Sequence, residues 1–278
     1  MTPRELTALR SVRWRLKPDL ALTNLDEIND FIERMGMCVQ TQRDSLALPS
    51  LSQAIMGRES VPLRGGSPVR EVLNEFSSRA LKKRSCIEVP FLSRFPVILS
   101  RESFTLLYAV HKQRRGSRGM SVPRTRLERE LLDFITDEES ATRKLIRDRF
   151  ELHRPAQRAA LDRALNALRL RLDILRTGAI RGEGALYQTP LAWDQGIARR
   201  AQYFSRQEAL KELVRRYVTA TVATSRRRVK RVFAAVAQAE EIDRALNMLI
   251  LTAAIEVDQQ LVIGGKKALV APKKALHG

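Results

Sequence analysis

The sequence predicts a mainly helical α+β fold with small β-hairpins, in which one arrangement of helices and strands recurs along the chain. Three observations lead to this prediction. Capping signals and apolar stripes of helical period are dense. A segment with strand-like composition lies at 86–99, between two of the predicted helices. The second half of the chain contains an internal repeat, which is typical of a duplicated structural unit.

The first part of the chain contains one hairpin and several helices, of which four have clear start or stop signals. A capping box with proline at the first helical position begins a helix over 2–16. An apolar stripe over 28–35 predicts a second helix, which a glycine ends. A Ser-Pro step begins a third helix over 67–80. The hairpin over 86–99 follows, and a serine then caps a helix over 100–113.

The repeat lies beyond a basic, glycine-containing linker. Residues 161–174 read LDRALNALRLRLDI and residues 242–255 read IDRALNMLILTAAI, so the pentad Asp-Arg-Ala-Leu-Asn occurs in both. The match extends upstream, where 141–150 parallels 223–233. Each copy is followed by a short strand pattern with a glycine turn. Duplication of one unit explains this pattern most simply.

Each unit reads as helix, helix, longer helix and two-stranded ribbon. This order is that of a winged helix-turn-helix, in which the third helix can enter a DNA major groove. The first part of the chain fits the same plan with an insertion. We therefore expect three tandem winged helix-turn-helix domains: 1–116, with a β-hairpin insertion, 117–205 and 206–278.

Composition favours an anionic partner. The 278 residues include 50 Lys and Arg against 31 Asp and Glu, a formal net charge of +19. Such an excess points to nucleic acid or to a membrane surface. No apolar run approaches the roughly 18 residues of a membrane span, and the region after Met1 lacks a signal-peptide pattern. We expect double-stranded DNA as partner, no membrane association and a cytoplasmic, nucleoid-associated protein.

Cysteine and histidine do not indicate a metal site. Cys38 and Cys86 read as small buried hydrophobic residues. The three histidines, His111, His153 and His277, have no ligand spacing. We therefore expect neither a metal nor a cofactor.

Basic side chains gather in the linker, in the second helices of the two repeat units and around the first wing turn. Phosphate contacts from such residues supply affinity with little sequence preference and a steep salt dependence. A solvated charged face is the alternative for any single arginine. The predicted nucleic-acid contacts are Arg43, Arg94, Arg118, Arg143, Lys144, Arg147, Arg169, Arg176, Arg181, Arg226, Arg227 and Lys230.

A pair of glutamines follows the second helix, in the segment MGMCVQTQRD over 35–44. Residues from Met37 to Gln42 alternate, which predicts an extended backbone. Gln40 and Gln42 would then project from one side, about 6.5–7 Å apart. A helix is expected to run from Leu46 to Met56. Two amides on one face can hold a water or a sugar between their oxygens, although paired polar residues often simply face solvent.

The front segment, which begins with LTALR at 6–10 and includes DEINDFIERMGMCVQTQRDSLALPSLSQAI at 26–55, resembles the AlkZ/YcaQ-type family of winged-helix DNA glycosylases. The tandem winged helices expected in the rest of the chain also match that family's architecture. In that family a Gln-x-Gln or Gln-x-Asp motif follows a helix that ends in a glycine-hydrophobic step. The resemblance implies that Gln40 and Gln42 are the catalytic-motif residues. It further implies excision of cationic N-alkylated purines, and in some members the unhooking of interstrand crosslinks.

Amide side chains suit this chemistry. A purine alkylated at N7 is positively charged and leaves as a neutral base, so little general-acid help is needed. What remains is to orient a water and to stabilise oxocarbenium character on the sugar, which amide oxygens can do electrostatically. No lysine nucleophile stands beside the motif, so a monofunctional DNA glycosylase acting as a monomer is expected.

The hairpin departs from the family pattern. An aromatic residue or a histidine from it often accompanies the motif in such enzymes. Here the segment 86–100 contains Phe91, Arg94 and Phe95 but no histidine. Two other functions remain open: a non-catalytic winged-helix DNA-binding protein, such as a dimeric transcription regulator, and a helical protein-interaction module.

Overall fold

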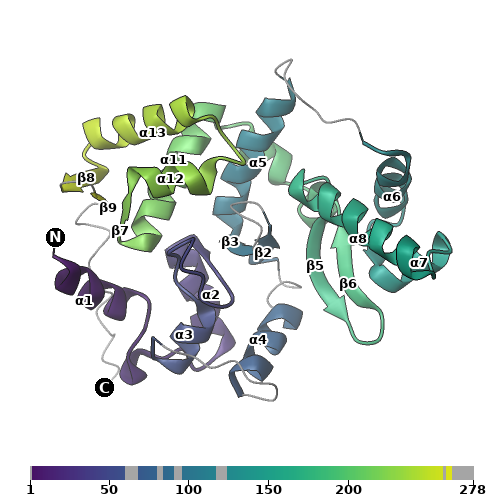
Figure 1. Cartoon of the computed structure of the whole chain (residues 1–278), viewed down its shortest axis with the longest axis horizontal. Helices are drawn as coiled ribbons and strands as arrows, with labels where there is room; N and C mark the ends of the chain where they lie inside the picture. The colour runs from purple at the N-terminus through teal and green to yellow at the C-terminus, as the bar shows by residue number, and fades with distance from the viewer. Residues whose placement is uncertain are drawn as a thin grey trace.

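The computed structural model describes residues 2–59, 68–79, 84–90, 96–116, 124–258 and 261–264 (Figure 1). The first part contains α1 (Pro3–Arg13), the 3-10 helix η1 (Pro18–Leu20), α2 (Leu25–Met35), β1 (Met37–Cys38), α3 (Leu51–Met56), α4 (Pro68–Arg79), β2 (Cys86–Val89), β3 (Val97–Ser100) and α5 (Arg101–Gly116). The middle part contains α6 (Arg126–Asp137), β4 (Ala141–Thr142), α7 (Arg143–Arg149), α8 (Pro155–Leu170), β5 (Leu175–Ile180), β6 (Gly184–Gln188), α9 (Pro190–Trp193) and α10 (Ile197–Ala201). The last part contains α11 (Arg206–Thr221), β7 (Ala223–Ser225), α12 (Arg226–Phe233), α13 (Ala239–Leu251), β8 (Ile255–Asp258) and β9 (Leu261–Gly264).

The order helix, strand, helix, helix, strand, strand occurs three times, beginning at α2, α6 and α11. All the strand pairs are antiparallel within two sheets, ordered β1-β3-β2-β5-β6-β4 and β7-β9-β8. Many helices with small antiparallel sheets confirm the predicted α+β class. The division into three winged-helix domains remains a prediction at this point. In the described part of the chain, no helix is long and apolar enough to cross a membrane.

Local sequence signals account for most helix ends. Thr2 and Glu5 form the predicted capping box of α1. Helix α2 buries its predicted apolar face and ends at Gly36, whose φ of 71° lies in the left-handed region that glycine adopts without strain. The hairpin expected over 86–99 forms as β2 and β3, which pair from Cys86↔Ser100 to Val89↔Val97.

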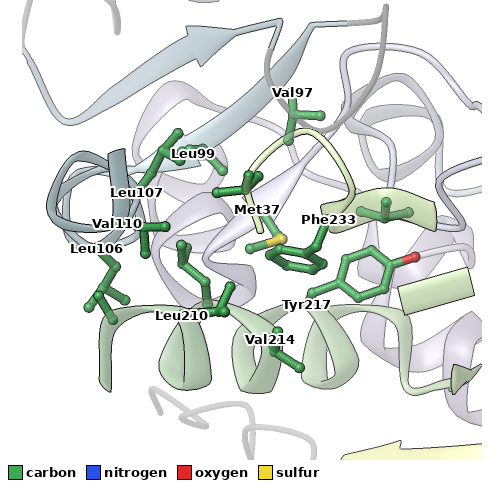
Figure 2. Packing of buried hydrophobic residues seen from close by; sticks show 14 of the residues in the cluster. Met37, Val97, Leu99, Leu106, Leu107, Val110, Leu210, Val214, Tyr217 and Phe233 are labelled. Carbon is green, nitrogen blue, oxygen red and sulfur yellow. The ribbon is translucent and has the colours of Figure 1, made fainter. Parts of the chain in front are cut away.

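Strand β1 lies between two hydrophobic cores. Met37 and Val39 belong to one core, and Cys38 belongs to the other, so the alternation predicted here separates two buried sides. Figure 2 shows the Met37 side chain beside Phe233 and Tyr217 in the first core. That core is built mainly from α5, α11, α12 and α13, so the first and last parts of the chain share it. Helices α2 to α4 enclose the second core, and α6 to α8 with the β5–β6 hairpin enclose a third.

Helix α11 ties distant segments together through polar groups that would otherwise be unpaired. The Tyr217 hydroxyl donates to the Leu46 carbonyl at 2.7 Å, in a buried position. The Trp14 indole N–H donates to the Ala220 carbonyl at 2.8 Å. Arg10 donates to the carbonyls of Thr221 and Ala223. The end of α11 therefore anchors both α1 and the loop that follows the two glutamines.

A buried carboxylate, Asp194, joins the middle part of the chain to helix α5 of the first part. Asp194 is 4% exposed and accepts from Arg101 of α5 at 2.9 Å and from Arg200 of α10. Burial alone would raise the pKa of Asp194, but its hydrogen bonds and ion pairs with the two arginines outweigh burial and lower it. Asp194 thus holds α10 against α5 as a charged group.

Replacing Tyr217 with Phe tests the anchor at Leu46. The substitution leaves a buried carbonyl unpaired, which costs about 1–3 kcal/mol of unfolding free energy. Urea denaturation measures the loss, and Tyr203→Phe on an exposed tyrosine is the matched control. Equal stability of the Tyr217→Phe variant and the wild type would contradict the anchoring role.

Replacing Asp194 with Asn tests the buried carboxylate through pH. Because folding lowers the pKa of Asp194, its charge contributes stability above the unfolded pKa, about 3.9. That contribution is lost as the pH falls through the folded pKa. The stability difference between wild type and Asp194→Asn should therefore be full near neutral pH and shrink in acid. Denaturation at several pH values, with Asp137→Asn as the exposed control, measures it, and a difference that grew in acid would refute the assignment.

Candidate functional site

The glutamine-bearing segment leaves the sheet earlier than the sequence predicts. Strand β1 has only two residues, and Val39 forms an isolated parallel bridge with Ser50. Residues 40 and 41 bend, so the predicted extended run as far as Gln42 is wrong. The backbone partner explains the bend, because the Gln40 carbonyl accepts from the Ser52 N–H at 3.0 Å, at the start of α3.

The helix expected from Leu46 begins instead at Leu51. Pro49 disfavours helical backbone at the residue before it. Residues 44–47 form a turn in which the Leu46 and Ala47 N–H groups donate to the Arg43 carbonyl, with Ala47 at φ 51°. Leu46 and Leu48 are buried in the first core, so both sides of this turn are fixed by packing.

The two glutamines occupy different environments. Gln40 is half-buried, and its carbonyl also accepts from the Ser50 hydroxyl at 3.4 Å. Gln42 is exposed, and its side-chain Oε1 accepts from Gln53 Nε2 at 2.7 Å. Its Nε2 donates to Asp44 Oδ1 at 3.2 Å. The first turn of α3 therefore holds the Gln40 backbone and the Gln42 side chain together.

Gln53 is the residue that sequence reasoning missed. It lies in α3 and is 3% exposed, yet it carries a primary amide. Its Nε2 donates to both Gln42 Oε1 and the Glu59 carbonyl, whereas its Oε1 is buried with no hydrogen-bond partner among the residues described. An unpaired buried acceptor costs about 1–3 kcal/mol. The only sequence signal is an amide between the apolar residues Leu51 and Ala54.

Amide groups do not titrate near neutral pH, so neither glutamine can act as a general acid or base. Gln42 keeps one lone pair on Oε1 and one N–H on Nε2 beyond the two hydrogen bonds described. Such a group can orient a water or a polar sugar atom by hydrogen bonding. It can also place a partial negative charge beside a developing cation.

The buried cysteines do not add a nucleophile. Cys38 and Cys86 are free thiols, buried as predicted. Burial raises the pKa of Cys86 to about 12 and raises that of Cys38, with further contributions from neighbouring groups. Both therefore remain protonated thiols at neutral pH, which are poor nucleophiles.

Four of the predicted basic residues of the middle part lie on α7 and at the wing turn, as expected: Arg143, Lys144, Arg147 and Arg181. Arg143 donates to both carboxylate oxygens of Asp162 at 2.9 Å, and Arg147 pairs with Asp148 at 3.1 Å. Lys144 and Arg181 are exposed, and neither side chain forms an ion pair within the described ranges.

The last part repeats this pattern on α12. Arg226 donates to Asn247 at 3.0 Å, and Lys230 pairs with Asp243 at 2.6 Å. Arg227 is exposed, and its side chain has no ion pair in the described part of the chain. In each repeat one helix, α7 or α12, thus carries basic side chains with polar partners and at least one basic side chain that forms no ion pair among the described residues.

Arg169 and Arg176 stand apart from the other predicted contacts. Both approach Glu88 Oε1, at 3.7 Å and 3.5 Å, where β2 and β5 join the two halves of the larger sheet. Glu88 is 7% exposed and lies inside the junction, whereas the Arg176 side chain is 39% exposed and reaches the surface. Their first role is to hold the middle part against the first.

Among the residues that the structure describes, the predicted cations on α7, the β5–β6 hairpin and α12 do not converge on the glutamines. Arg43, next to Gln42 in sequence, is exposed, while Arg94 and Arg118 lie outside the described residues. In Figure 1, α7 and the β5–β6 hairpin lie at the right-hand end, far from α12 in the left half. Helices α2 and α3, which flank the glutamine segment, also lie in the left half.

Comparison with known proteins gives one informative match. No protein-family model matches the chain, and no curated protein matches it. Among solved structures, the chain is similar to the DNA glycosylase AlkZ of Streptomyces sahachiroi, with a TM-score of 0.55 and 14% sequence identity. The match covers 94% of this chain and 70% of that one. The resemblance predicted from the segment around the glutamines therefore extends to the fold of nearly the whole chain.

Proposed function

We propose that this protein is a monofunctional DNA glycosylase of DNA repair, which hydrolyses the N-glycosidic bond of cationic N-alkylated purines. The observation that carries the proposal is the Gln-x-Gln segment, held by α3 on a scaffold that has the fold of a DNA glycosylase. Purines alkylated at N7 of guanine are the proposed substrates. Interstrand crosslinks formed by bifunctional alkylators are a further proposed substrate.

The proposed architecture has three tandem winged helices, over 1–116, 117–205 and 206–278. Support comes from the threefold recurrence of the element order and from the antiparallel sheet orders β1-β3-β2, β5-β6-β4 and β7-β9-β8. A chain with three such units suits a monomer that surrounds one lesion. A winged-helix regulator would instead be expected to dimerise on two half-sites.

In the proposed reaction, the cationic base supplies most of the driving force. The glycosidic bond breaks as the positive charge moves from the purine to the sugar. The Gln40 and Gln42 amides then orient a water toward the sugar carbon, and their oxygens stabilise the oxocarbenium charge. The water bonds to that carbon, and its proton passes to solvent. No covalent enzyme intermediate forms, and no cofactor is required.

Phosphate contacts would come from both repeats. Lys144, Arg181 and Arg227 are exposed cations available to DNA. Arg143, Arg147 and Lys230 are paired with aspartates at the surface, and such exposed pairs contribute only about 0–1 kcal/mol each. A phosphate can therefore replace an aspartate as their partner at small cost.

One observation favours the non-catalytic alternative. Both ends of the Gln42 amide already have hydrogen-bond partners, Gln53 and Asp44. A DNA-binding protein without chemistry, including a transcription regulator, could use the same fold with these amides serving structure alone. Base release separates the two proposals.

Single-turnover assays on duplex DNA containing 7-methylguanine test the reaction. The wild type should release the base faster than the spontaneous rate. Gln40→Ala/Gln42→Ala should lower the enzyme-dependent rate by about 10²-fold or more, as expected when electrostatic stabilisation of the transition state is removed. Gln207→Ala, on an exposed glutamine of α11, is the control. Equal release by the wild type and the double variant, with DNA binding intact, would leave the non-catalytic proposal standing.

Salt dependence tests the phosphate-binding residues. The triple variant Lys144→Ala/Arg181→Ala/Arg227→Ala should bind duplex DNA more weakly. The slope of log affinity against log salt should become shallower by about 1 for each phosphate that the variant no longer neutralises. The triple variant Arg4→Ala/Arg129→Ala/Arg199→Ala removes the same charge from exposed positions outside the predicted set. If both variants flatten the slope equally, the assigned surface is wrong and net charge alone explains binding.

A further inference from the structure

We propose that Gln53 is a positioning residue of the site, which fixes the orientation of the Gln42 amide for the reaction. The inference rests on the proposed function, because Gln42 is taken there as a catalytic residue. It concerns a buried residue outside the Gln-x-Gln motif. The role assigned to Gln53 acts through Gln42 and involves no contact with the substrate.

The hydrogen bonds determine which way the Gln53 amide faces. Its two partners, Gln42 Oε1 at 2.7 Å and the Glu59 carbonyl, are both acceptors. Only the nitrogen of a primary amide can donate to both at once, and it has two hydrogens to do so. Nε2 therefore faces Gln42, and the opposite orientation would set oxygen against oxygen on both sides.

The arrangement is poor for stability alone. Gln53 is 3% exposed, and its Oε1 has no hydrogen-bond partner in the portion of the chain described. An apolar side chain at this helix position would avoid an unpaired buried acceptor. The neighbouring α3 residues Leu51 and Ala54 are apolar and fully buried. The amide at position 53 is thus explained by the two hydrogen bonds that its nitrogen donates, one to the Glu59 carbonyl and one to the Gln42 side chain.

The consequence for Gln42 is a defined orientation. Gln53 holds Oε1 from the buried side, and Asp44 holds Nε2 from the exposed side. The remaining lone pair on Gln42 Oε1 and the remaining N–H on its Nε2 therefore point in fixed directions, because the side chain is held in one rotamer. The backbone at Gln40 is held by the same helix turn, through the Ser52 N–H at 3.0 Å. One turn of α3 thus sets both motif positions, which is the preorganisation that orienting a water requires.

Two substitutions at position 53 separate positioning from packing. Gln53→Met keeps the side-chain length and fills the site with apolar atoms, but cannot donate. Gln53→Glu keeps the shape and makes the donor depend on pH. When the introduced carboxyl is protonated, it can still donate to Gln42; when it is ionised, it presents only acceptors to two acceptors. Burial raises the pKa of such a carboxyl toward neutral pH.

The first measurement is single-turnover release of 7-methylguanine. Gln53→Met should lower the rate by about 10- to 100-fold, as expected when a reacting group is misplaced, with unchanged DNA affinity. Gln53→Glu should approach the wild-type rate at low pH and fall toward the Gln53→Met rate as pH rises from about 5 to 9. The pH dependence of the Gln53→Met rate gives the contribution of charged groups near this position in the sequence, Arg43, Asp44, Arg58 and Glu59, and is subtracted from that of Gln53→Glu. Gln207→Met is the exposed control.

The second measurement does not depend on activity. In ¹⁵N-labelled protein without DNA, the Gln42 side-chain NH₂ signals should shift and exchange faster with water in Gln53→Met, whereas Gln207→Met leaves them unchanged. If the wild type releases no base while these signals respond, the proposed function fails and the orienting hydrogen bond stands. If Gln53→Met keeps the wild-type rate, or leaves the Gln42 signals unchanged, the positioning role is overturned. If Gln53→Met folds poorly, the Gln53→Glu variant gives the test: a release rate that falls reversibly as pH rises supports the positioning role, and a rate with the wild-type pH dependence overturns it.

Discussion

The structure depends on how the chain passes between two hydrophobic cores at β1. Met37 and Val39 face the core shared with α11, and Cys38 faces the core under α2 and α4. Because both faces are buried, a slip of one residue would exchange side chains of different size between the two cores, so packing fixes the register of these three residues. The residues directly after β1, which include both glutamines and the start of α3, are positioned by this packing. The site is thus built on packed elements even though its side chains lie on a turn.

Charge is organised separately from the glutamine segment. The chain has a formal net charge of +19, and several arginines in its described part form ion pairs with carboxylates. Asp194 and Glu88 are buried at junctions between parts of the chain, where removing one partner costs more than the pair itself contributes. Part of the basic composition therefore holds the parts of the chain together, and the remainder is what the proposed DNA contacts would use.

The sequence predicted correctly the helix ends, helix face and hairpin that depend on residues close together in the chain. The capping box of α1, the apolar face of α2, the Gly36 stop and the hairpin over 86–99 were all confirmed, because each depends on residues close in the chain. The extent of β1 and the start of α3 were predicted wrongly. The end of β1 depends on the Val39–Ser50 bridge and the turn before α3 on the Tyr217 bond to Leu46, and periodicity cannot reveal such contacts. Gln53 was missed for the same reason, because its interaction with Gln42 joins side chains 11 residues apart in the sequence. Pro49 was a local signal against a helix from Leu46 that the apolar pattern did not take into account.

The most direct test is a structure of the protein bound to duplex DNA that carries a positively charged pyrrolidine in place of one nucleotide sugar. Such a group mimics the charge of the oxocarbenium transition state. If Gln42 stabilises the transition state, the charged ring should lie against the Gln42 amide oxygen, with the Gln53–Gln42 hydrogen bond intact and a water between the ring and the two motif glutamines. A ring bound elsewhere, or a Gln42 side chain turned away from it, would rule out a catalytic role for Gln42.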